Sequence, residues 1–250
     1  LGLETTVYGD RKPHAATTEK AIDYLEFAAA NHIGGMLVEG WNTGWKKLGE
    51  HGVFDFVTPT PDYDLKKVAA KAKELGVDLI MHHETGSDVA GYEKYMDTAY
   101  MLCKELGIRA IKSGYAGNKM VEYHQSQPMV RHYQKAVEEA AKYGIMLDIH
   151  EPIKGTGTWR TWPNLMTREG VRGQEWEAWS SGNSASHTTT IPFVRGLAGP
   201  TDYTPGVFDI FYAKSRKGRE KYIRDKAYLD MTRVHTTLAH QLALMVTIYS

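Results

Sequence analysis

The first 150 residues repeat one order of apolar and polar positions: an amphipathic helix, a glycine and then a short apolar strand. The helical periodicity predicts helices over residues 17–31, 62–75, 92–106 and 128–143. Thr17 is a residue type that caps a helix N-terminus, and Gly76 a type that ends a helix in the left-handed conformation. The pattern therefore predicts helices that alternate with strands.

Each predicted helix is followed by an apolar segment that ends in polar residues. These segments are MLVEGWN at 36–42, VDLIMHHE at 77–84, IRAIKSGY at 108–115 and IMLDIHE at 145–151. Almost continuous apolar sequence is typical of strands in a parallel sheet that is covered on both faces. The strands begin roughly 30 to 45 residues apart, which is the length of one β-α unit. We therefore expect an α/β protein with a parallel sheet.

The regular pattern fades after residue 151. Residues 152–210 are rich in Gly, Pro, Ser and Thr, which predicts long loops, with strands near TTTIPFV at 188–194 and RGLAGPTDY at 195–203. A last helix is predicted over about residues 224–245, and the apolar end LALMVTIYS at 242–250 has the pattern of a strand. Because the chain begins at Leu and stops at this apolar segment, we expect a fragment of a longer protein.

Two α/β architectures fit this order, a doubly wound open sheet and a (β/α)8 barrel. The barrel is favoured because chemistry-bearing residues follow several successive strands, whereas an open sheet gathers them at one switch point. The nucleotide-binding pattern G-x-G-x-x-G is also absent. With about six or seven strands in the pattern, against the eight of a complete barrel, we expect one domain over 1–250. We expect this domain to be a TIM barrel that lacks its first strand and part of its last strand region.

Composition narrows the classes of function. Lys plus Arg and Asp plus Glu number 30 each, so the formal net charge is zero and the basic excess typical of nucleic-acid binding is missing. The apolar segments fall short of the ~18 residues of a membrane span. Cys103 lies in an apolar helical pattern and is expected to be buried and inert. Neither a nucleic-acid partner nor a membrane span is predicted.

Carboxylates, histidines and aromatics gather at the predicted strand ends, where a barrel holds its chemistry. A glycosidic bond is cleaved by an acid that protonates the leaving oxygen and a carboxylate that activates water or attacks the sugar, while aromatic rings stack on sugars. The residues that favour such a hydrolase are Glu39, Trp41, His82, His83, Glu84, Lys112, Ser113, Tyr115, Asp148, His150, Glu151, Trp159, Arg160, Trp162, Glu169, Arg172, Glu175, Asp202 and Tyr203. A simpler role for Trp159 and Trp162 is to hold a loop in place. The segment EYHQ at 122–125 is expected at the surface.

A metal ion is a further expectation. If Glu84, Glu151, Glu169 and Glu175 converge, they cannot all stay ionised without a cation or large pKa shifts. Ligands that offer only oxygen favour calcium over zinc.

A zinc hydrolase is the alternative metal enzyme, with His82, His83 and His150 as ligands. The spacings H-x-H and H-E-x-x-H are absent from the sequence. Adjacent histidines on a strand also point to opposite faces, so that His82 and His83 do not easily share one ion. Calcium is therefore preferred.

Longer segments resemble a known family, in the same order along nearly the whole chain. They are GGMLVEGWNTGW, VFDFVTPTPDYD, MHHETGSDVAGYEKYMD, IKSGYAGN, HEPIKGTGTWRTWPNLMTREGVRGQEWEAW and AGPTDYTPG. They resemble glycoside hydrolase family 97, which comprises bacterial, often periplasmic, α-glucosidases and α-galactosidases with calcium-dependent catalysis. The resemblance implies a catalytic (β/α)8 barrel between an N-terminal β-sandwich and a C-terminal β domain. It also implies a periplasmic location and an oligosaccharide or α-glucoside substrate.

The resemblance also implies roles for individual residues. Glu175 in RGQEW matches the general acid, while Glu151 in HEP and Glu84 in HHET match the carboxylates that hold and activate water in the inverting branch. Glu151, Glu169 and Glu175 match calcium ligands, and a further ligand in the family comes from the N-terminal domain. Residues that match the substrate pocket are His82, His83, His150, Trp41 and Lys112.

The family divides by mechanism at the end of the fourth strand, where its retaining members carry an aspartate nucleophile. This chain has IKSGY there, with Gly114 at the position of the nucleophile. The missing carboxylate leaves room for water between acid and base, as inverting enzymes require. We therefore expect an inverting α-glucosidase. A retaining α-galactosidase and an inactive sugar-binding fragment are the alternatives.

Overall fold

The computed structural model describes residues 15–48, 50–117, 122–177, 180–208, 210 and 234–249. The chain divides into two compact units. The first comprises residues 1–154 and 158–166, and the second residues 155–157 and 167–250. Within the described ranges, no helix is both long and apolar enough to cross a bilayer.

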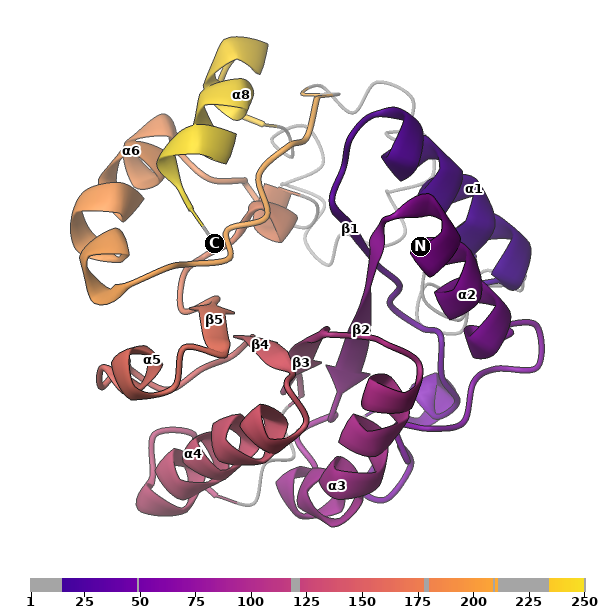
Figure 1. The fold of residues 1–250 in the computed structure, drawn as a ribbon. Helices are drawn as coiled ribbons and strands as arrows, with labels where there is room; N and C mark the ends of the chain where they lie inside the picture. The colour runs from indigo at the N-terminus through magenta and orange to yellow at the C-terminus, as the bar shows by residue number, and fades with distance from the viewer. Residues whose placement is uncertain are drawn as a thin grey trace. The chain divides into compact units, whose positions relative to one another are not determined.

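The first unit is a series of β-α units (Figure 1). Its helices are α1 (Thr18–Ala30), α2 (Leu65–Leu75), α3 (Val89–Glu105), α4 (Gln127–Lys142) and the short α5 (Thr158–Thr161), with a 3-10 turn η1 (Trp45–Lys47). Its strands are β1 (Gly35–Leu37), β2 (Asp78–Glu84), β3 (Ala110–Gly114), β4 (Met146–Ile149) and β5 (Leu165–Arg168), the last of which runs on into the second unit. The four strands and four helices predicted before residue 151 are therefore confirmed.

The strands lie in the order of the sequence, β1-β2-β3-β4-β5. Strands β1 to β4 pair in parallel, with Met81 opposite Ile111 and Ile111 opposite Leu147. A sequential order contains no reversal, whereas a doubly wound sheet binds its ligand at the point where the order reverses. The order is that of strands in a (β/α)8 barrel, and the predicted fold class is confirmed.

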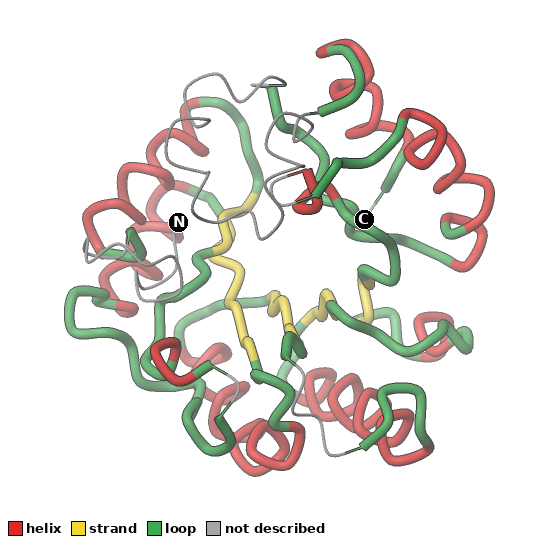
Figure 2. Tube along the Cα trace, turned by 180° about the vertical axis from the view of Figure 1, so that it is seen from behind, coloured by secondary structure: helices red, strands yellow, loops and turns green. Residues whose placement is uncertain are grey.

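Helices α1 to α4 lie along one side of strands β1 to β4 (Figure 2). The helices turn their small and branched residues toward the sheet, where Leu25 of α1, Val68 of α2 and Val137 of α4 join Ile111 of β3 in one buried core. Cys103 of α3 is part of this core, and burial raises the pKa of its thiol to about 12. The prediction of a buried, inert thiol agrees with both facts.

Helix ends follow the capping signals of the sequence. The Thr17 side chain accepts a hydrogen bond of 3.3 Å from the Lys20 amide at the start of α1. Gly76 ends α2 with φ of 69°, a left-handed conformation that costs little only for glycine. Asp64, not singled out from the sequence, caps the start of α2 by accepting from the Lys67 amide at 3.0 Å.

The second unit differs most from the prediction. Its described helices are η2 (Gln174–Glu177), α6 (Ala185–Val194), η3 (Gly196–Ala198) and α8 (Leu238–Thr247). The strand predicted at 188–194 is wrong because those residues lie in α6, and the strand at 195–203 is replaced by η3 and irregular structure. The apolar end at 242–250 begins in α8 and is not a strand. Part of the helix predicted at 224–245 lies outside the described residues, and β5 was not predicted at all.

The first testable prediction concerns the core of the first unit. Leu25 on α1 is fully buried, and truncation to alanine removes methyl groups from a packed interior. We expect Leu25→Ala to lower the free energy of unfolding by about 2–5 kcal/mol. The neighbouring Tyr24 is half exposed, so that Tyr24→Ala should change it by no more than about 0.5 kcal/mol. Urea denaturation of both variants measures the difference, and equal losses would contradict the described packing.

Candidate active site

The carboxyl ends of β2, β3 and β4 present side chains on both faces of the sheet. The parallel register places His82 opposite Lys112, and Lys112 opposite Asp148. Residues opposite one another on neighbouring strands point to the same face, and successive residues point to opposite faces. His82, Lys112 and Asp148 therefore share one face, on which Glu84 comes two residues further along β2. His83 points to the other face.

His82 is buried between aromatic residues of the segment after β1. Its ring stacks on Trp45 with ring centroids 5.7 Å apart, and its carbonyl accepts a hydrogen bond of 2.8 Å from Trp41 Nε1. Burial lowers the pKa of His82 well below its ordinary value, and the nearby charge of Lys112 lowers it further. Its Nδ1 atom is buried without a hydrogen-bond partner among the described residues, which is unusual for a buried polar atom. Trp45 was not singled out from the sequence.

His83 lies in the hydrophobic core. Its ring stacks on Tyr100 of α3 with centroids 6.3 Å apart, and its Nδ1 lies 3.1 Å from the hydroxyl of Tyr92. Burial lowers the pKa of His83 to about 3, so the ring is neutral at physiological pH. The opposite orientation of His82 and His83 agrees with the sequence argument, and it gives the predicted contact of His83 with substrate no support.

Glu84 ends β2 as a buried carboxylate. Its Oε1 accepts hydrogen bonds from two main-chain amides, Gly86 at 2.8 Å and Ala116 at 3.0 Å. Burial raises the pKa of Glu84 to about 8 and the charge of Glu151 adds to the rise, although the two amide bonds oppose it. The Glu84 carboxyl group therefore keeps its proton to a higher pH than a free carboxyl group does, and a cation beside it favours the ionised form.

Gly114 ends β3 directly opposite Glu84. A Cβ atom at this glycine would overlap Oε2 of Glu84 and lie 3.1 Å from its Cδ. The Glu84 carboxylate thus occupies the space that a side chain at position 114 would need.

Glu151 follows β4 in a strained main-chain conformation. Its φ is 44°, in the left-handed region that non-glycine residues seldom adopt. Two hydrogen bonds hold it there: its Oε2 accepts from the Tyr115 amide at 2.8 Å, and its carbonyl accepts from the Tyr133 hydroxyl at 2.7 Å. Strain held by specific contacts is typical of functional residues.

An open pocket of about 540 Å³ lies beside Glu151. Its lining includes Glu122, Tyr123 and His124, so that the segment, which lies at the surface as expected, also borders this pocket. Tyr123 is 77% exposed. The Tyr133 hydroxyl lies 3.3 Å from His124 Nε2 and links this segment to the main chain of Glu151.

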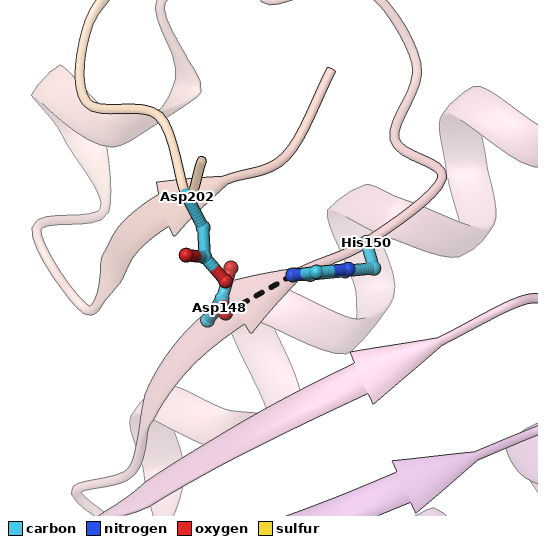
Figure 3. Close-up of side chains that lie close together, drawn as sticks. All are labelled: Asp148, His150 and Asp202. Atoms are coloured by element: carbon cyan, nitrogen blue, oxygen red, sulfur yellow. Dashed lines mark ion pairs between the residues drawn. The ribbon is translucent and has the colours of Figure 1, made fainter. Parts of the chain in front are cut away.

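His150 and Asp148 form an ion pair at the end of β4 (Figure 3). The distance from His150 Nε2 to Asp148 Oδ2 is 3.5 Å. His150 is mostly buried, and the main chain here is held by a bond of 2.9 Å from its amide to the Ser113 carbonyl. The pair orients an imidazole on the strand end that also carries Glu151.

The two remaining predicted carboxylates belong to the second unit. Glu169 follows β5, and its carbonyl accepts a bond of 2.6 Å from the Thr201 hydroxyl. Glu175 lies on η2 with an exposed side chain. The structure thus brings Glu84 and Glu151 together in the first unit, while the roles of Glu169 and Glu175 stay predictions.

A buried carboxylate of the second unit was missed by the sequence argument. Glu177, also on η2, accepts a hydrogen bond of 3.0 Å from the Asn183 amide, and burial raises its pKa. Arg172 donates to Asn183 Oδ1 at 2.8 Å and places its guanidinium 4.3 Å from the ring centroid of Trp176. These contacts hold the loop around η2.

Trp159 and Trp162 pack against the core of the first unit. This position agrees with the simpler of their two predicted roles, that of pinning the segment after β4.

Comparisons with known proteins agree with this geometry. The family profile described as glycoside hydrolase 97 matches residues 3–171. A retaining alpha-galactosidase of Bacteroides thetaiotaomicron is 30% identical over 189 residues, which are 73% of this chain and 26% of that protein. Two solved structures of a glycoside hydrolase family 97 enzyme from Pseudoalteromonas sp. strain K8, one in complex with acarbose and one, an E480Q variant, in complex with panose, are 38% identical. Each superimposes with a TM-score of 0.84 over 98% of this chain and 38% of that one.

The chain therefore spans about a quarter of the curated relative, and less than half of the solved enzyme. The matched profile covers more than half of the chain. It includes β1 to β5, Glu84 and Glu151. This chain belongs to glycoside hydrolase family 97.

Proposed function

We propose that the protein which carries this chain hydrolyses α-glucosidic bonds with inversion at the anomeric carbon. The observation that carries the proposal is that the Glu84 carboxylate fills the space that a side chain at position 114 would need. A retaining enzyme needs a carboxylate nucleophile, and the family resemblance puts it at position 114. That position has no side chain, and the space beside it is filled by Glu84.

Two carboxylates remain beside one another to handle the attacking water. Glu151 faces an open pocket and Glu84 is buried behind it, both held by main-chain amides. We assign Glu151 and Glu84 to hold and activate the attacking water, with Glu151 as the base that takes its proton. We assign Glu175 to protonate the leaving oxygen, since its motif matches that of the family acid. His82 has a neutral ring and a buried Nδ1 without a partner among the described residues, and we assign it a hydrogen bond to a sugar hydroxyl.

The more similar of the relatives support the proposed substrate class. The solved enzyme at 38% identity binds acarbose and panose, and panose is a trisaccharide of α-linked glucose. The similarity to the relative named a retaining alpha-galactosidase, at 30% identity, instead favours an α-galactoside as substrate of this protein. Because Gly114 removes the nucleophile that a retaining enzyme needs, we prefer the glucoside. We also propose a periplasmic location and flanking domains, which the family resemblance implies.

We further propose that calcium is the resident cofactor. Glu151, Glu169 and Glu175 offer only carboxylate oxygens, the hard donors that calcium prefers, so the chemistry of the donor set fits this ion. When bound, the ion supplies positive charge that favours ionised carboxylates beside it.

The stereochemistry of the product tests the proposed mechanism. Proton NMR of p-nitrophenyl α-glucoside hydrolysis should show β-glucose as the first product, since water attacks from the face opposite the leaving group. The same measurement with p-nitrophenyl α-galactoside compares the two sugars. If the α anomer appears first, the mechanism is retaining and the assignment of Gly114 is wrong.

A matched pair of variants tests the role of Glu151. Glu151→Gln keeps the side-chain volume and an acceptor for the Tyr115 amide but removes the base, so kcat should fall by about 10²–10⁴-fold. Glu122→Gln removes another carboxylate that lines the same pocket and has no assigned role, and should leave kcat within about twofold. Steady-state kinetics separate the two, and equal effects would refute the role.

Metal removal tests the cofactor. Dialysis against excess chelator should abolish hydrolysis, and added calcium should restore it. Magnesium at the same concentration is the control, because it demands a tighter octahedral site and should restore little. Undiminished hydrolysis in excess chelator would show that the enzyme needs no divalent ion.

A further inference from the structure

Two consecutive main-chain amides, directly after β3, donate hydrogen bonds to the carboxylates of Glu84 and Glu151. The Tyr115 amide donates to Glu151 Oε2 at 2.8 Å, and the Ala116 amide donates to Glu84 Oε1 at 3.0 Å. Since the amides belong to neighbouring peptide units, a rotation of the main chain at this point moves both donors. The orientation of this short segment therefore sets the positions of both carboxylates.

The segment is anchored through the side chain of Tyr115. The Tyr115 hydroxyl lies 2.8 Å from His132 Nε2 of α4. His132 Nδ1 lies 2.9 Å from Glu93 Oε1 of α3, and Glu93 Oε2 accepts from Lys135 Nζ at 2.7 Å. Tyr115 and His132 are almost wholly buried, while Glu93 is partly exposed. A continuous chain of hydrogen bonds thus runs from α3 through α4 to the end of β3.

The donors and acceptors of this chain match in only one way. The ionised carboxylate of Glu93 accepts only, so Nδ1 of His132 carries the proton. Burial lowers the pKa of His132, although Glu93 opposes this, and the ring is neutral. Its Nε2 is then an acceptor, and the Tyr115 hydroxyl donates to it. The arrangement fixes the Tyr115 ring by hydrogen bonding and not by packing alone.

The Tyr115 ring is also fixed from the side. It packs edge-on against Tyr133, with ring centroids 4.9 Å apart. Tyr133 in turn donates to the Glu151 carbonyl at 2.7 Å. Both the side chain and the main chain of Glu151 therefore depend on neighbouring tyrosines whose rings touch.

We propose that Glu93, His132 and Tyr115 are positioning residues: they fix the peptide amides of residues 115 and 116, and through them the carboxylates of Glu84 and Glu151. The structural part of the proposal stands on the hydrogen bonds alone. Its consequence for turnover rests on the proposed function, because only then are the two carboxylates catalytic.

Hydrogen–deuterium exchange of the full chain measures how well its main-chain amides are protected, and this measurement does not depend on activity. Tyr115→Phe removes the hydroxyl and keeps the ring and the amide. We expect peptides that cover residues 113–117 to exchange roughly three- to tenfold faster in this variant, with other peptides unchanged, because the hydroxyl loses its hydrogen bonds with His132 and Ser113. Tyr143→Phe is the matched control, since it removes another tyrosine hydroxyl that links α4 to α3, through Asp97, and it should leave exchange at 113–117 as in the wild type.

A second pair of variants covers the case in which Tyr115→Phe fails to fold. Glu93→Ala removes the acceptor for His132 from a partly exposed position on α3, and should also speed exchange at 113–117. Glu93→Gln keeps an acceptor oxygen, and should restore slow exchange. Unchanged exchange in both Tyr115→Phe and Glu93→Ala, or an equal rise in all peptides, would overturn the proposal, since the chain would then serve core stability only.

Kinetics of the same variants test the consequence for turnover. Misplaced catalytic groups lower kcat, so Tyr115→Phe and Glu93→Ala should reduce kcat by about tenfold or more with KM within about twofold, and Glu93→Gln should recover most of the loss. Faster exchange with unchanged kcat in an active enzyme would refute the catalytic part. If the wild-type protein cleaves neither α-glucoside nor α-galactoside, the proposed function fails. Faster hydrogen–deuterium exchange at residues 113–117 in the variants would still support the structural part of the proposal, that Tyr115 fixes these amides.

Discussion

Two acidic side chains, Glu84 at the end of β2 and Glu151 after β4, lie close enough for the charge of Glu151 to raise the pKa of Glu84, and the first unit holds both in place. The parallel register brings Glu84 of β2 and Gly114 of β3 to the same level of the sheet, and β3 lies between β2 and β4, the strand that precedes Glu151. The missing side chain at Gly114 makes room for the Glu84 carboxylate, and the next two amides along the chain point at the two acids. One short segment thus supplies both the space and the hydrogen bonds.

The same constraint explains the strain at Glu151. A glycine would adopt φ of 44° at no cost, whereas a glutamate there costs on the order of 1–3 kcal/mol. Glycine has no carboxylate to offer the Tyr115 amide, so the hydrogen bonds from Tyr115 and Tyr133 must offset the strain. Local preference gives way here to the position of a functional group, which is typical of sites where sequence and fold disagree.

The regular half of the fold could be predicted because each element carries its own local signal: apolar strands, helical periodicity and glycines such as Gly76 that end helices. The segment TTTIPFV has no such signal, since its β-branched residues favour a strand, yet Ser184 caps a helix that buries Ile191. At the site, alternation predicts that His82 and His83 face apart, but only the placement of α3 decides which one joins the core. The contact of Tyr115 with His132 joins residues that are far apart in the sequence and belong to different elements, so no spacing rule reveals it.

Main-chain amides have one advantage over a charged side chain as the partner of a catalytic carboxylate. A lysine or arginine beside a general base favours the ionised form of that base, so that the base takes a proton from water less readily. An amide carries no net charge and cannot be titrated, so it orients the carboxylate oxygen without adding another ion to the site. Its weakness is that a loop amide is only as fixed as the loop itself. A buried tyrosine held by a neutral histidine answers that weakness without adding a charge near the two acids, which is why Tyr115 and His132 suit this place better than an ion pair would.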